Sequence, residues 1–152
     1  MQTSLPLDTL IELAREKVDS ATRTLGSLQS ARSTAQRQLE MLEDYLGDYR
    51  VRLQQAVQQG LSAAGWQNYQ RFIATLEAAI GEQRNVLVHA EGQLDAGRQI
   101  WQDNKRQLNS FDALAERRQR AEAVLNNRRA QKANDEFSAR LVQRRAALRS
   151  QP

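Results

Sequence analysis

The sequence predicts an all-α protein: a long antiparallel two-helix coiled-coil hairpin with an extended C-terminal helix. Helix-favouring Ala, Leu, Gln, Arg and Glu dominate its 152 residues, and the two prolines are Pro6 and Pro152. Only 5% of the residues are aromatic, so a thick globular core is not expected. Apolar residues recur at alternating steps of four and three along two long segments, which is the pattern of a coiled-coil seam.

The first helix is predicted at about residues 5–58, within one coiled-coil domain of residues 1–152. Pro6 suits a first turn, and Ser4 or Asp8 is the candidate cap. Only Arg32 interrupts the heptad series, which consists of Leu7, Ile11, Ala14, Val18, Ala21, Leu25, Leu28, Ala35, Leu39, Leu42, Leu46, Tyr49, Leu53 and Ala56.

A turn is predicted at residues 59–62, followed by a second helix at about residues 63–148. Gly60 tolerates the left-handed conformation that a helix end needs, and Ser62 can cap the next helix. The heptad series then resumes with Trp66, Tyr69, Ile73, Leu76, Ile80, Gln83, Leu87, Ala90, Leu94, Gly97, Trp101, Asn104, Leu108 and Phe111.

The two series match each other when the chain is folded back at Gly60, because antiparallel partners have a nearly constant sum of residue numbers. Ala21 is predicted to meet Gly97, a small pair beside a large one. The pairs that sum to 118 or 119 are Leu53 with Trp66, Leu46 with Ile73, Leu39 with Ile80, Leu25 with Leu94, Val18 with Trp101 and Leu7 with Phe111.

The formal net charge of +4 comes from a basic tail, residues 112–152. This tail has 10 Lys and Arg against 5 Asp and Glu, whereas residues 1–111 have 12 against 13. Its apolar stripe is sparse, so we expect the tail to extend beyond the paired helices and to be fully ordered only inside a partner. The stripe consists of Leu114, Ala121, Leu125, Phe137, Leu141 and Leu148.

Three interpretations of the basic tail stay open: a specific acidic protein partner, a solvated charged helix and a nucleic-acid contact. Aromatic residues do not alternate with the basic ones, and no nucleic-acid-binding motif is present, so the protein partner is preferred. The basic residues are Arg117, Arg118, Arg120, Arg128, Arg129, Lys132, Arg140, Arg144, Arg145 and Arg149.

Catalytic, metal and cofactor sites are not expected, and the chain is predicted not to be an enzyme. A two-helix rod has no interior in which titratable groups can converge. His89 is the single histidine, and Glu43, Asp44 and Asp48 lack the oxygen spacing of a calcium loop, so we interpret all four as solvated. The chain has no cysteine, no signal-peptide pattern and no long apolar run, which favours a cytosolic protein.

The stretch "WQNYQRFIATLEAAI" contains more aromatic residues than a single seam can bury. Phe72 lies off the seam, and antiparallel pairing brings it beside Tyr45 and Tyr49 on one face. A partly exposed aromatic patch is typical of a protein-docking surface, although additional helix packing is the alternative. Gln83 lies on the same side, and the predicted docking residues are Gln38, Leu42, Tyr45, Tyr49, Phe72, Leu76 and Ala79.

The chain resembles the FliJ family of the flagellar type III export apparatus over nearly its whole length. The resemblance rests on "LDTLIELAREKVDSATRTLG", "QLEMLEDYLGDYR", "WQNYQRFIATLEAAI" and "QKANDEF". The family is similar to the γ subunit, the central stalk, of rotary ATPases. The related stalk of needle-type secretion systems is a near alternative, and a structural or nucleic-acid-associated coiled coil is a more distant one.

The resemblance implies specific partners and a cytoplasmic location, peripheral to the inner membrane at the flagellar base. These partners are the hexameric export ATPase FliI, the gate protein FlhA and flagellar export chaperones, with no nucleic acid and with membrane contact only through the gate. The gate-docking surface of the family falls on the seven residues named above, but Gln83 occupies a position where the family has histidine. The ring contact is expected in the tail, at Arg117, Arg118, Arg128, Arg129, Arg144 and Arg145.

Overall fold

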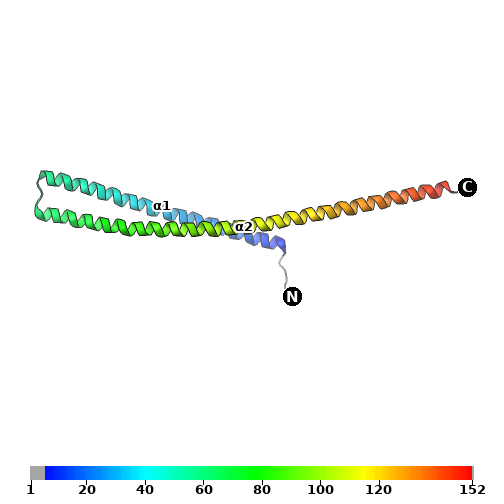
Figure 1. The fold of residues 1–152 in the computed structure, drawn as a ribbon, viewed down its shortest axis with the longest axis horizontal. Coiled ribbons are helices and arrows are strands. Elements are labelled where there is room, and N and C mark those ends of the chain that lie inside the picture. Colours follow the sequence, from blue (N-terminus) through cyan, green and yellow to red (C-terminus); the bar gives the residue numbers. More distant parts are fainter. Residues whose placement is uncertain (1–5, 152) are drawn as a thin grey trace, which may run out of the picture. The chain divides into compact units, whose positions relative to one another are not determined.

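A computed structural model describes residues 6–151 and confirms the predicted all-α hairpin. It consists of α1 (Leu7–Gln59) and α2 (Ala63–Arg149), with no strand in the part described. The chain divides into two compact units, which we call the hairpin unit (residues 14–106) and the terminal unit (residues 1–13 and 107–152). In the hairpin unit the two helices run antiparallel, side by side, away from the turn between them (Figure 1).

The first helix begins one residue after Pro6, whose carbonyl accepts hydrogen bonds from the amides of Thr9 at 3.0 Å and Leu10 at 3.2 Å. Asp8 therefore lies inside the first turn and not at a capping position. A carboxylate there is stabilised by the positive N-terminal end of the helix dipole. Ser4, the other candidate cap, lies outside the described residues.

The turn between the helices has the predicted chemistry. Gly60 has a φ of 91°, a conformation that L side chains rarely adopt, and its amide donates to the carbonyl of Val57 at 3.3 Å. The Ser62 hydroxyl accepts a 3.1 Å hydrogen bond from the amide of Gly65, so Ser62 caps α2 as predicted.

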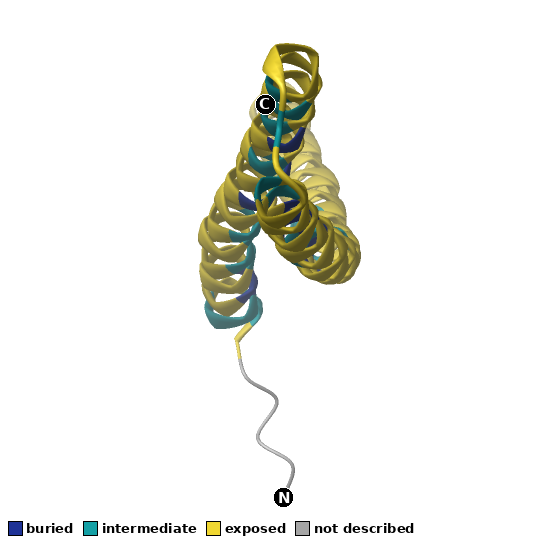
Figure 2. Ribbon diagram, turned by 90° about the vertical axis from the view of Figure 1, so that its left-hand side faces the viewer, coloured by how far each residue is buried: buried dark blue, intermediate teal, exposed yellow. Residues whose placement is uncertain are grey.

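The core of the hairpin unit is a single narrow seam between the helices. Buried positions form a broken line in a molecule that is otherwise mostly exposed (Figure 2). The central cluster consists of Leu39, Leu46, Ile73, Leu76 and Ile80. Leu42, Tyr49, Leu53 and Leu87 pack against this cluster and are half-buried. These residues all belong to the predicted heptad series, and they include the predicted pairs of Leu46 with Ile73 and Leu39 with Ile80.

Side-chain contacts between the helices follow a slightly different register from the predicted sum of 118 or 119. Their residue numbers sum to values from 117, for Tyr45 with Phe72, to 127, for Arg50 with Glu77. Helical side chains lean toward the N-terminus of their own helix. Between antiparallel helices this lean brings together residues whose numbers have a larger sum than those of residues at equal height.

Two predicted features of the seam are wrong. Trp66, which the heptad series assigned to the seam, is 46% exposed. Leu61 of the turn is half-buried and packs against Gly65: a Cβ on Gly65 would lie 2.7 Å from the Leu61 Cδ1. Gly97 is buried beneath Leu28, whose Cδ1 lies 2.6 Å from the position of a Cβ there, and so Ala21 is not its main partner.

The terminal unit has a small apolar contact and a long exposed helix. Ile11 and Leu108 are buried, and Leu7 and Phe111 are half-buried. From residue 116 to residue 151 every residue is exposed, and the helix continues without a break to Arg149. That the tail is fully ordered only inside a partner stays a prediction.

Candidate functional site

Four aromatic side chains from the two helices form one continuous cluster, which we call the aromatic patch: Tyr45, Tyr49, Tyr69 and Phe72. The ring centroids of Tyr49 and Phe72 are 4.2 Å apart, and those of Tyr49 and Tyr69 are 5.5 Å apart. Tyr45 lies 6.3 Å from Phe72 and 6.2 Å from Tyr49. Tyr49 is therefore the centre of the patch, and it joins the rings of α1 to those of α2.

The aromatic patch is partly open to solvent. Phe72 is 38% exposed and Tyr45 is 49% exposed, while Tyr49 and Tyr69 are half-buried. The heptad pattern assigned Tyr69 to the seam, so it missed that this ring also belongs to the patch. Tyr69 lies seven residues before Leu76, a seam residue, and this heptad spacing indicated only a seam position. A hollow of about 260 Å³ adjoins the rings and is lined by Tyr49, Gly65, Asn68, Tyr69 and Phe72.

The other predicted docking residues lie at different depths. Gln38 is exposed, Leu42 and Ala79 are half-buried, and Leu76, only 7% exposed, belongs to the core beneath the surface. The exposed part of the predicted surface is thus mainly aromatic, with Gln38 as a polar neighbour.

Gln83 connects the seam to this surface. Its side-chain amide donates to the backbone carbonyl of Ala35 at 3.1 Å and to the side-chain oxygen of Gln38 at 3.2 Å. A half-buried amide inside an apolar seam needs such partners, because an unpaired one would lose its hydrogen bonds to water. Gln83 therefore holds Gln38 in place at the edge of the docking residues.

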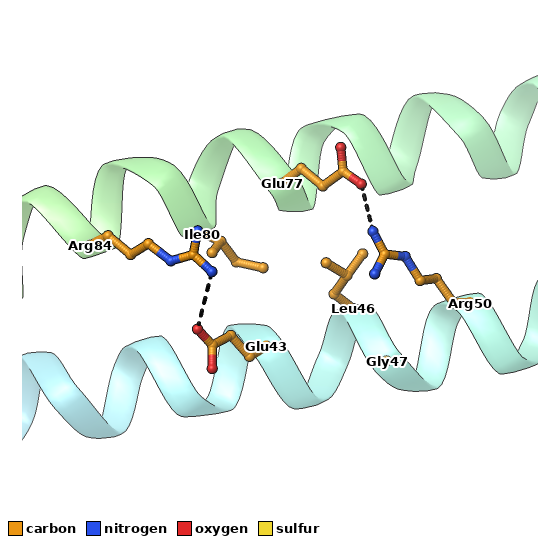
Figure 3. A pocket seen from close by; sticks show the side chains of 7 residues that line it. All are labelled: Glu43, Leu46, Gly47, Arg50, Glu77, Ile80 and Arg84. Atoms are coloured by element: carbon orange, nitrogen blue, oxygen red, sulfur yellow. Dashed lines mark hydrogen bonds and ion pairs between the residues drawn. The ribbon is translucent and has the colours of Figure 1, made fainter.

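The opposite edge of the same core segment is ionic. Arg50 pairs with Glu77 at 2.8 Å and Glu43 with Arg84 at 3.6 Å, and Figure 3 shows both pairs bridging the helices. Leu46 and Ile80 lie between these pairs, and they line the same hollow. At 3.6 residues per turn, Glu43 and Arg50 lie on one flank of Leu46, and Tyr45 and Tyr49 on the other.

The predicted ring-contact residues of the tail are all exposed: Arg117, Arg118, Arg128, Arg129, Arg144 and Arg145. The Nε of Arg118 lies 3.6 Å from the Oε1 of Glu122, and the Nη2 of the neighbouring Arg120 lies 3.9 Å from the Oε2 of Glu116. These i, i+4 pairs place part of the positive charge near carboxylates of the same helix. Between residues 6 and 151, no group of three or more acidic or histidine side chains could hold a metal ion.

The model of one protein family, described as "Flagellar FliJ protein", matches residues 3–147. The chain belongs to the FliJ family. It is 37% identical over 139 residues to the flagellar FliJ proteins of Salmonella typhi and Escherichia coli (strain K12). In both comparisons the match covers 91% of this chain and 95% of the relative. The FliJ protein of Buchnera aphidicola is 26% identical over 105 residues, which are 69% of this chain and 72% of that protein.

Family membership confirms the resemblance predicted from the central sequence blocks. It places the chain in flagellum biogenesis and protein export, as a coiled-coil component. Across residues 6–151 neither helix is apolar over a long enough stretch to cross a membrane.

Proposed function

We propose that this FliJ-family chain is a non-enzymatic, stalk-like coiled coil that links the export ATPase FliI to the gate protein FlhA. In this role the aromatic patch docks on the gate, and the basic tail contacts the hexameric ATPase ring. The same chain assists the cycling of export chaperones, and it works on the cytoplasmic side of the inner membrane, which it contacts only through the gate complex. Family membership and the residue-level resemblance support this proposal.

The single observation that carries the gate contact is the exposure of aromatic rings outside the seam. A two-helix coiled coil is held together by its heptad positions, so Phe72 and Tyr45 are not needed to close the core. Large aromatic side chains that stay partly exposed and clustered are the residues that most often anchor protein interfaces.

The ATPase contact is supported by the charge and exposure of the tail. All six arginines proposed to contact the ring are on the surface of one uninterrupted helix. Arginine forms strong, often bidentate hydrogen bonds with carboxylates, which suits an acidic protein surface.

Phe72→Ala tests the gate contact. It should weaken binding of the full chain to purified FlhA by about 30-fold, since an interface anchor typically contributes about 2 kcal/mol. Isothermal titration calorimetry measures this affinity, and motility of cells carrying the variant reports the consequence.

Trp66→Ala is the matched control, because Trp66 is 46% exposed on the same helix and makes no ring contact with the aromatic patch. It should leave FlhA affinity within about twofold. Equal effects of the two substitutions, or an unchanged affinity of Phe72→Ala, would contradict the proposed docking site.

A further inference from the structure

The C-terminal end of α2 has an exposed apolar stripe. Phe137, Leu141 and Leu148 are 62%, 41% and 73% exposed. At 3.6 residues per turn, the three side chains lie within about 40° of one another around the helix axis. Val142 is also apolar and 67% exposed, but it lies roughly 100° or more away from this stripe.

Arginines border the stripe on both sides. Arg140 and Arg144 lie on one flank, while Arg145 and Arg149 lie on the other, as the helical period requires. A shallow hollow combines both kinds of side chain, since it is lined by Phe137, Arg140, Leu141, Gln143, Arg144 and Ala147. Residues 137–151 contain these four arginines and no Asp or Glu.

These four arginines differ from Arg118 and Arg120, which lie earlier in the tail. Arg118 and Arg120 have acidic partners one turn away, at Glu122 and Glu116. Among the described residues, the arginines beside the stripe have no carboxylate within ion-pair distance. Their positive charge is therefore available to a partner.

We infer that residues 137–149 dock as a helix in an apolar protein groove whose two rims carry carboxylates. The inference rests on the proposed function, in which the protein that provides the groove is the FliI ring. Phe137, Leu141 and Leu148 fill the groove, and the arginines on the two flanks pair with the two rims. Anchors spaced by one or two turns are the usual pattern of helix-in-groove recognition.

The same features disfavour a bilayer or a nucleic acid as the occupant. The stripe spans only about 40° of the helix surface, which is narrower than the apolar face that an interfacial amphipathic helix buries in lipid. Nucleic-acid phosphates would attract the arginines but would leave Phe137 and the leucines without an apolar surface.

The test measures binding of the full-length chain to purified FliI assembled with a non-hydrolysable nucleotide. The double variant Phe137→Ala/Leu141→Ala should bind at least 10-fold more weakly. Val142→Ala, the matched control from the other face, should bind within twofold of the original chain. Alanine favours helices, so circular dichroism should show unchanged helicity in both variants.

Two further measurements separate failure of the inference from failure of the proposed function. The original chain failing to bind FliI would overturn both. An additional variant removes proposed ring-contact arginines that lie outside the stripe: Arg117→Gln/Arg118→Gln/Arg128→Gln/Arg129→Gln. Should it lose binding while Phe137→Ala/Leu141→Ala keeps it, the ring contact stands and the docked stripe is refuted. Stripe-dependent co-sedimentation with phosphatidylglycerol vesicles, with FliI affinity unchanged, would also refute the groove.

Discussion

Leu46→Ala should lower the free energy of unfolding of the hairpin by about 2–3 kcal/mol. Leu46 is 8% exposed and packs in the cluster with Leu39, Ile73 and Ile80. The substitution removes three buried carbons at about 0.8 kcal/mol each, which amounts to about 2.4 kcal/mol. The cavity adds little, because the Leu46 and Ile80 side chains line a hollow that is open to solvent at the ionic edge.

Urea denaturation followed by far-UV circular dichroism measures this loss. Val51→Ala serves as the control, because Val51 is 53% exposed on the same helix and its truncation should change stability by less than about 0.5 kcal/mol. A loss below about 1 kcal/mol for Leu46→Ala, or equal losses for the two variants, would refute the view that the narrow seam carries the stability of the hairpin.

Three further predictions concern two glycines and one ion pair. Gly81→Ala should stabilise the chain by about 1 kcal/mol, because a Cβ there meets no atom within 4 Å and alanine is the better helix former. Gly60→Ala should destabilise it, because φ is 91° at the turn, and thermal unfolding of the two variants checks both signs. Arg50 and Glu77 are both more than half exposed, so a double-mutant cycle should give a coupling below about 1 kcal/mol that shrinks in high salt. A larger coupling that does not change with salt would contradict the prediction that this exposed ion pair contributes little to stability.

Much of the candidate site followed from the sequence because antiparallel pairing is a geometric rule. Once Gly60 was identified as the turn, Tyr45, Tyr49 and Phe72 had to lie near one another, and their rings are in contact distance. The depth of each residue followed only in part. Leu76 is buried, as its place in the heptad series predicts. The partial exposure of Phe72 and Tyr45 depends on how their rings pack on Tyr49, which residue spacing does not determine.

The sequence by itself determined the two helices, their antiparallel pairing and the basic tail. Heptad spacing, two terminal prolines and a glycine turn are local properties that leave few other arrangements for this chain. Only the tertiary structure decided that Trp66, a residue of the heptad series, stays 46% exposed while Leu61 of the turn is half-buried. It also showed that the side-chain amide of Gln83 donates hydrogen bonds to the Ala35 carbonyl and the Gln38 side chain. These details depend on how the side chains of one helix pack against those of the other. The spacing of apolar residues along the sequence does not determine that packing.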